Sequence, residues 1–320
     1  MRRRIRAHLP PGVRAGRPHG SGRRCMTGAA VVAGALLGAL AAPAEARIIH
    51  QERSLYSTIL IDRQGPLVCL QFSVRRDQRN QSCINQRRPR EMVFVYARMV
   101  MTSLLLEPEP DRILILGLGG GTLPLALDEL LPQAEIDVVE IDPAVVRVAR
   151  EYFGFAPSER VDVFAQDGRV FVKRAAHQGE KYDLVILDAF NGEYIPEHLM
   201  TREFLEEVQN LLAPNAVLVA NTFSISGLYN HESATYADVF GTFYNMRSDD
   251  TGNRVIITRN GPLPARDELR QRAEALQPHV EPYGVDYDRL LPLMTTEVDW
   301  DPEARILTDQ YSPANLLRTE

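Results

Sequence analysis

An apolar strand followed at once by a glycine-rich turn constrains this chain more than any other feature. Residues 113–116 are Ile-Leu-Ile-Leu, and such a continuous apolar run indicates a central parallel strand that is buried on both faces. The glycines that follow are Gly117, Gly119, Gly120 and Gly121. The spacing of apolar residues over 123–131 then predicts a helix, whose free N–H groups a ligand could meet. A tight strand-to-helix turn without a ligand is the alternative.

The next predicted strand, residues 135–142, carries acids at its carboxyl end. Glu140 lies about 20 residues beyond the glycines, where an acid can accept the hydroxyl protons of a ribose. A carboxylate there favours an unphosphorylated ribose, because it repels a 2′-phosphate. Strand, turn, helix, strand and acid together predict a nucleoside-binding site.

Further strands alternate with helices along the chain. The predicted strands are 161–165, 182–187, 216–220 and, as a late edge strand, 253–258. This alternation predicts an α/β fold with a Rossmann-like, doubly wound parallel sheet. Ligands of such sheets sit outside the carboxyl ends of the strands. Four candidate residues occupy these ends and are expected to share one rim, namely Gly117, Glu140, Asp167 and Asp188.

Not every polar residue near these ends is interpreted as part of a site. Asp167, before Gly168, fits a helix cap as well as a ligand contact. Asp188 follows a buried strand and precedes an apolar Ala-Phe pair, where a carboxylate is costly to desolvate unless it is used. His198 and His231 have no partner spacing, and we interpret both as structural or surface residues. Without a C-x-x-C or clustered histidines, no metal site is expected.

Residues 1–46 differ in composition from the rest of the chain. Eight arginines and no acid precede Cys25, an uncharged Ala/Gly/Leu/Val run spans 29–42, and Ala-Glu-Ala ends at Ala46. This layout predicts a secretory signal peptide and an exported, periplasmic protein. The alternatives are an uncleaved N-terminal anchor, or a cytoplasmic protein whose true start is Met26.

Removing that segment leaves an acidic chain. It would hold 28 basic and 41 acidic residues, a net charge near −13. An acidic body without a basic stripe argues against nucleic acid and anionic membranes as partners. It is compatible with cationic small molecules.

Residues 47–108 are predicted to form a small N-terminal β-hairpin domain, and 109–320 the Rossmann-like domain. Cys69 and Cys83 flank a predicted hairpin tip at 76–80. They are expected to pair as a disulfide if the protein is exported, and to be ordinary small residues if it is cytosolic.

Several of these motifs, in this order and spacing, resemble the spermidine synthase family of polyamine aminopropyltransferases, and in particular its divergent spermidine synthase-like branch. The matching segments are Gly117–Thr122, Val139–Asp142, Asp167-Gly168, the strand that ends at Asp188, Phe94-Val-Tyr96 and Leu307–Pro313. The likeness spans roughly residues 54–317. It implies a methyltransferase-like Rossmann domain, a β domain and a homo-oligomer such as a dimer.

The resemblance also implies roles for individual residues. Glu140 would hold the ribose of decarboxylated S-adenosylmethionine, and Asp167 would face the adenine amino group. Asp188 would accept a proton from the attacking amine, with Tyr96 helping to position it. The reaction would be an attack by a primary amine on the carbon beside a sulfonium, releasing methylthioadenosine.

The chain departs from the family pattern around the amine. Gly120 stands where the family carries the aspartate that grips the aminopropyl nitrogen, and Asn191 where it carries a second carboxylate. The residues after Tyr96 are Ala97 and Arg98 in place of glutamine and glutamate, and Ser57 replaces a glutamine. These differences predict an altered amine site.

The sequence therefore indicates an aminopropyltransferase with altered amine choice and no metal. One alternative is an S-adenosylmethionine-dependent methyltransferase, for which Gly120 would leave room for the donor carboxylate. The other is a non-catalytic protein that binds a nucleoside or a polyamine.

Overall fold

Seven strands form one sheet at the centre of the protein in the computed structural model, which describes residues 47–72, 80–190 and 195–313. Every described residue belongs to one compact unit. The predicted leader, residues 1–46, lies outside the described residues. The strands are β5 (Arg112–Leu116), β6 (Glu135–Glu140), β7 (Val161–Ala165), β8 (Tyr182–Leu187), β9 (Leu212–Phe223), β10 (Tyr244–Arg247) and β11 (Asn253–Arg259).

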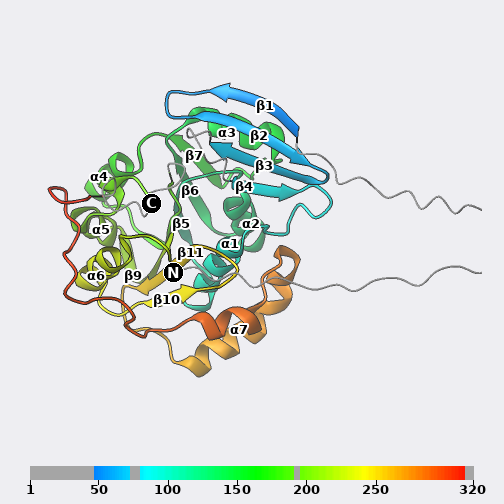
Figure 1. The fold of residues 1–320 in the computed structure, drawn as a ribbon. Coiled ribbons are helices and arrows are strands. Elements are labelled where there is room, and N and C mark those ends of the chain that lie inside the picture. Colours follow the sequence, from blue (N-terminus) through cyan, green and yellow to red (C-terminus); the bar gives the residue numbers. More distant parts are fainter. Residues whose placement is uncertain (1–46, 73–79, 191–194, 314–320) are drawn as a thin grey trace, which may run out of the picture. The chain divides into compact units, whose positions relative to one another are not determined.

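The sheet order is β10-β11-β9-β8-β5-β6-β7 (Figure 1). The strands from β9 to β7 are parallel, whereas β11 pairs antiparallel with β9, and β10 antiparallel with β11. The predicted Rossmann-like α/β fold is confirmed, but the sheet is mixed rather than wholly parallel. The prediction that 253–258 forms an edge strand is wrong, because β10 covers that edge of β11.

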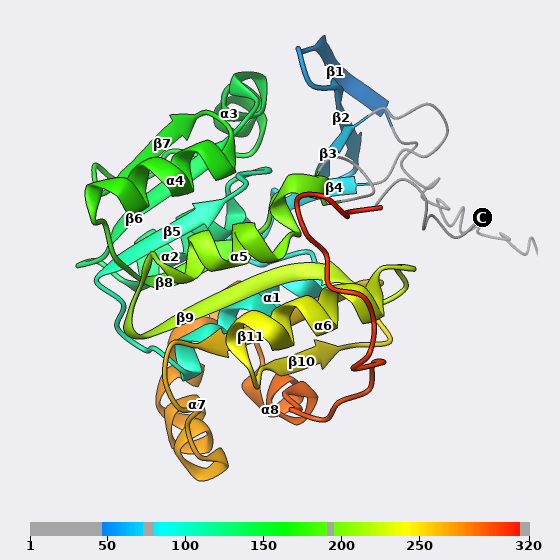
Figure 2. The same ribbon diagram turned by 90° about the vertical axis from the view of Figure 1, so that its left-hand side faces the viewer.

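Helices cover both faces of this sheet (Figure 2). Ile113 and Ile115 of β5 face one hydrophobic core, and Leu114 and Leu116 face the other, which explains the continuous apolar run. Residues of α1 (Val95–Val100), η1 (Met101–Leu105), α2 (Thr122–Leu130), α7 (Arg266–Val280) and α8 (Tyr287–Leu290) belong to the first core. Residues of α4 (Gly168–Gln178), α5 (Arg202–Gln209) and α6 (Tyr229–Phe240) belong to the second. Short 3-10 turns are η2 (Glu197–Leu199), η3 (Glu281–Tyr283) and η4 (Leu291–Leu293).

Polar side chains cap the starts of two helices near the site. Asp142 caps α3 (Pro143–Tyr152) by accepting from the Ala144 N–H at 2.9 Å. Thr201 caps α5 in the same way, as its sequence context predicted. No helix among the described residues is long and apolar enough to cross a membrane.

A second, four-stranded antiparallel sheet precedes the large one. Its order is β1-β2-β3-β4, with β1 (Arg47–Arg53), β2 (Thr58–Gln64), β3 (Leu67–Phe72) and β4 (Asn80–Asn85). Ile59 and Ile61 of β2 are fully buried, together with Val68 and Leu70 of β3. This face packs against Val145 and Val148 of α3, so α3 joins the two sheets. The predicted small N-terminal β structure is therefore present, as an antiparallel sheet.

A disulfide joins the last two strands of the small sheet, β3 and β4. Cys69 on β3 lies directly opposite Cys83 on β4, and the two are bonded. The hairpin tip predicted at 76–80 lies outside the described residues except for Asn80, which begins β4. The pairing that the sequence predicted for an exported protein is thus the one in the structure.

Candidate active site

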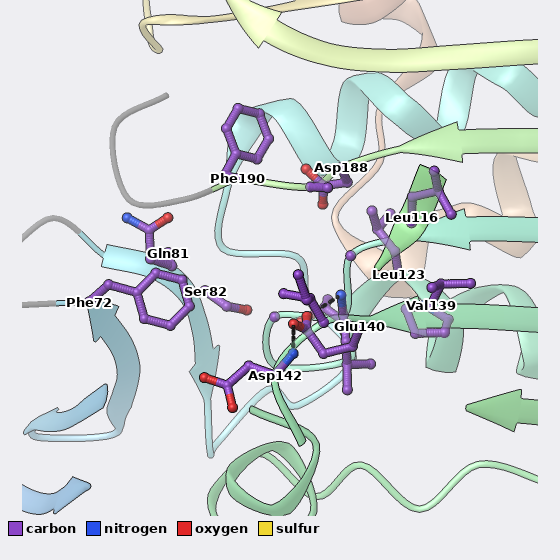
Figure 3. Close-up of a pocket in the computed structure, with 18 of the residues that line it drawn as sticks. Phe72, Gln81, Ser82, Leu116, Leu123, Val139, Glu140, Asp142, Asp188 and Phe190 are labelled. Carbon is purple, nitrogen blue, oxygen red and sulfur yellow. Dashed lines mark hydrogen bonds between the residues drawn. The ribbon is translucent and has the colours of Figure 1, made fainter. Parts of the chain in front are cut away.

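The carboxyl ends of β5, β6 and β8 open into a cavity of about 270 Å³ (Figure 3). Residues of β4 and the end of β3 face it from the small sheet, including Phe72, Gln81 and Ser82. Four carboxylic acids line the cavity, and they are Glu140, Asp142, Asp167 and Asp188. No lysine or arginine is among the described residues that line it. The cavity therefore suits a ligand that carries positive charge.

The glycine-rich turn passes very close to the end of β8. Gly117 has φ +103°, and a Cβ built on it would lie 2.2 Å from the Asp188 carbonyl oxygen. Only glycine fits this crossing, because any side chain would strike the backbone that carries Asp188. Gly117 and Gly119 line the cavity.

The other two glycines of the turn do not line the cavity. A Cβ on Gly120 would lie 2.7 Å from Phe153 Cδ1 and 2.8 Å from Ser82 Oγ, and one on Gly121 would lie 2.3 Å from Phe155 Cδ2. Gly120 was expected to leave room for a donor carboxylate. That expectation is wrong, because Phe153 and Ser82 fill the space.

Glu140 stands at the tip of β6, as predicted for a ribose ligand. Its carboxylate accepts the N–H of Leu118 at 3.1 Å and that of Asp142 at 2.9 Å, one on each oxygen. Burial raises the pKa of Glu140 to about 6, although these backbone donors lower it. Each oxygen keeps further acceptor capacity, so two ribose hydroxyls could donate to it.

Asp142 is a further acid of this corner, to which the sequence assigned no role. Its side chain is almost fully buried, with one oxygen engaged in the α3 cap and Oδ2 without a hydrogen-bond partner. Figure 3 shows the carboxylate on the same side of the cavity as Ser82. Because buried polar atoms are nearly always paired, a ligand hydroxyl or ammonium would complete this site.

Asp167 serves as a helix cap and also faces the cavity. Oδ1 accepts the Val170 N–H of α4 at 2.9 Å, and Oδ2 lies 3.0 Å from Nε2 of His198. Asp167, Gly168 and His198 all line the cavity. His198 is exposed, as expected of a surface residue, but it also lies at the edge of the cavity, a position that the sequence did not indicate. His231 lies elsewhere, with Nδ1 2.7 Å from the Arg305 carbonyl oxygen.

Asp188 is held from two sides at the end of β8. The Tyr96 hydroxyl of α1 donates to Oδ2 at 3.3 Å, and the Asn221 amide of β9 donates to Oδ1 at 2.8 Å. Burial raises the pKa of Asp188 to about 7, and these two donors hold it lower than burial alone would. Burial and the nearby Asp188 raise the pKa of Tyr96, so it remains a neutral donor. An aspartate with a pKa near neutrality is suited to act as a base.

The positions that depart from the family pattern are also placed. Ala97 and Ser57 line the cavity, and the Ser57 hydroxyl is buried without a partner. Arg98 does not reach it, because its guanidinium donates to the carbonyl oxygens of Met92 and Val93. Asn191 lies outside the described residues.

This geometry defines a class of protein. A Rossmann-like sheet of the methyltransferase type carries two buried acids on one rim, Glu140 and Asp188, and burial raises the pKa of both. Such an arrangement is typical of enzymes of the methyltransferase-like fold.

Comparison with known proteins places the chain within that class. A family model described as the spermine/spermidine synthase domain matches residues 93–246. The polyamine aminopropyltransferase of Vibrio vulnificus is 50% identical over 276 residues, covering 86% of this chain and 92% of the relative. The chain therefore belongs to the spermidine synthase family.

Two solved structures are similar as well. A probable spermidine synthase from Corynebacterium glutamicum aligns with a TM-score of 0.60 and 22% identity, over 80% of this chain and 97% of its own. Human methyltransferase-like protein 13 in complex with SAH aligns with a TM-score of 0.51 and 29% identity, over 65% of this chain and 94% of its own. The first supports the fold, and the second shows that the scaffold also resembles a methyltransferase.

Proposed function

We propose that this protein transfers an aminopropyl group from decarboxylated S-adenosylmethionine to a primary amine and releases methylthioadenosine. One observation carries the proposal: Asp188, with a pKa of about 7, opens into the same acid-lined cavity as Glu140. The 50% identity to a polyamine aminopropyltransferase supports the same reaction.

The residues provide the steps that such a transfer needs. The amine nitrogen attacks the carbon beside the sulfonium, the C–S bond breaks, and its electron pair remains on sulfur. The new N–C bond leaves an extra proton on nitrogen, which the ionised Asp188 accepts. Glu140 would fix the nucleoside and Tyr96 the orientation of Asp188, so that the reacting atoms are held in line.

The charge of the cavity supports a donor without a carboxylate. Ordinary S-adenosylmethionine carries a carboxylate that would require a cationic partner. The described lining offers four acids and no lysine or arginine, and position 120 offers no extra room. A decarboxylated donor and an amine acceptor are both cationic and match this lining.

Methyl transfer is the second candidate, favoured by the similarity to methyltransferase-like protein 13. The two reactions release different nucleosides. The purified protein would be incubated with a mixture of amines and with each donor separately, and the nucleoside identified by mass spectrometry. Methylthioadenosine released from the decarboxylated donor supports our proposal. S-adenosylhomocysteine released from the ordinary donor supports methyl transfer. If neither nucleoside is released, both reactions are contradicted.

The Asp188→Asn variant provides the matched control for this assay. The amide keeps the size of the side chain but cannot accept the proton. We expect nucleoside binding to persist while turnover falls by about a hundredfold or more, the usual contribution of a positioned base. A fully active variant would remove Asp188 from the reaction.

We propose in addition that the protein is exported and forms a dimer. The signal-like residues 1–46 and the Cys69–Cys83 disulfide support export, because disulfides persist in oxidising compartments. Cell fractionation with an N-terminally deleted control tests the location, and light scattering tests the oligomeric state.

A further inference from the structure

Asp188 is connected to a line of amide side chains that crosses the sheet. Asn221 on β9 donates through Nδ2 to Asp188 Oδ1 at 2.8 Å, and accepts through Oδ1 from Asn253 Nδ2 at 2.9 Å. Asn253 opens β11, and its own Oδ1 accepts from the Thr251 hydroxyl at 2.9 Å. The Thr251 oxygen in turn accepts the Asn253 backbone N–H at 3.2 Å. The line thus follows the strand order β8-β9-β11.

The asparagine side chains of this line have one preferred orientation, which the Asp188 carboxylate and the Asn253 amide support together. The two ends of an asparagine amide are nearly equal in size but opposite in hydrogen-bonding character. The ionised Asp188 can only accept, so Asn221 must present its N–H₂ to it and its Oδ1 to Asn253. The N–H₂ of Asn253 stabilises this orientation of Asn221, and the Thr251 hydroxyl completes the line by donating to Asn253 Oδ1. With this polarity the carboxylate of Asp188 faces a donor.

Asn221 and Asn253 are not substrate-binding residues in this geometry. Neither is among the residues that line the candidate active-site cavity, and Asn221 is almost fully buried. Asn221 therefore acts on the cavity only through Asp188, and Asn253 only through Asn221.

We infer that Asn253 and Asn221 form a positioning relay that keeps Asp188 ionised and correctly oriented for proton acceptance. This inference rests on the proposed role of Asp188 as the base. Without an N–H donor on Oδ1, the ionised carboxylate would lose one of its two side-chain hydrogen bonds, and burial would favour the protonated, inactive form.

Two other side chains and the glycine turn lie close to Asp188 and Asn221. Tyr96 from α1 donates to the other oxygen of Asp188. Glu232 from α6 lines a small void together with Asn221, but it is paired with the buried Arg254 at 3.1 Å. The glycine turn presents only the backbone of Gly117 to Asp188.

The Asn253→Asp variant reverses the relay at almost constant volume. A carboxylate at 253 can only accept, so Asn221 would turn its N–H₂ toward it and its carbonyl oxygen toward Asp188. We expect the pKa of Asp188 to rise by about one unit or more, because a hydrogen bond to a charged group is lost. The acidic limb of the pH profile of kcat/KM, where activity falls as the pH is lowered, should move to higher pH by the same amount. The Asn253→Ala variant removes the donor without adding charge and should shift the limb in the same direction by less.

A double-mutant cycle separates the relay from simple charge repulsion. In an Asn221→Ala background, Asn253→Asp retains its charge but has no amide to turn, so its effect should shrink. The matched control is Asn245→Ala on β10, a buried asparagine that hydrogen-bonds to Tyr229 and Asp299 and should leave the limb in place. An unshifted limb in both Asn253 variants, or an undiminished shift in the Asn221→Ala background, would overturn the relay.

A second readout does not require turnover. In protein with 13C-labelled aspartate carboxyls, the Asp188 signal is the one lost in Asp188→Asn, and its pH titration gives the pKa directly. If the protein transfers no aminopropyl group, the proposed function fails, while this titration still decides whether Asn253 controls Asp188.

Discussion

Gly120→Asp would restore the acid that the spermidine synthase pattern places in the glycine turn, and we expect it to harm the protein rather than improve it. The new Cβ would lie 2.7 Å from Phe153 Cδ1 and 2.8 Å from Ser82 Oγ, both well inside normal contact. Phe153 is buried between α3 and the small sheet and has little room to move. Overpacking of this kind costs about 1–3 kcal/mol.

That loss corresponds to a fall of roughly 2–12 °C in melting temperature for a domain of this size. Thermal denaturation followed by circular dichroism measures it. The control is Gly252→Asp, at an exposed position whose added Cβ would meet Ile225 at an ordinary 3.5 Å, so its stability should stay within about 0.5 kcal/mol. If the Gly120→Asp variant has the same melting temperature as the wild type and transfers the aminopropyl group to amines faster, the steric argument is refuted.

Three further perturbations test the site and its scaffold. Glu140→Ala should weaken nucleoside binding by about 2–4 kcal/mol, roughly 30- to 1000-fold in Kd, because two hydrogen bonds to a carboxylate are lost. Calorimetry measures the affinity, and an unchanged value would disprove the assignment of Glu140 to the ribose. As pH falls below about 7, protonation of Asp188 should lower kcat/KM by about tenfold per unit, since only the ionised form accepts a proton, and a flat acidic limb would contradict this. Replacing Cys69 and Cys83 with alanine should lower stability by about 3 kcal/mol, the value for a loop of this length. Denaturant titration measures this last effect, and equal midpoints for variant and wild type would count against it.

The sequence was sufficient to locate the rim of the site, because strand ends and glycine turns are local signals. Gly117, Glu140, Asp167 and Asp188 each follow an apolar run, and in a parallel sheet such positions meet at one edge. Tyr96 was found only through resemblance to a family, since nothing local in α1 indicates that it reaches Asp188.

Features that depend on distant packing could not be predicted. His198 contacts Asp167 across 31 residues of sequence, and the orientation of Asn221 is stabilised by Asn253, which lies 32 residues away. Strand β10 is only four residues long and gives no clear periodicity, so the edge of the sheet was assigned to its neighbour. The direction in which Gly120 faces was equally hidden, because Phe153 and Ser82 approach it from separate elements.

The packing of the small sheet on α3 has a consequence for the order in which the chain folds. The apolar residues of β2 and β3 leave the ribosome before Val145 and Val148, the partners that cover them, have been synthesised. A nascent sheet of this size exposes its apolar face until α3 arrives, and that interval is when it is open to aggregation or to a chaperone. The Cys69–Cys83 bond joins two strands that both precede α3, so in an oxidising compartment it can secure their register without α3. The small sheet is therefore completed only when α3, the helix that Asp142 caps, has been synthesised.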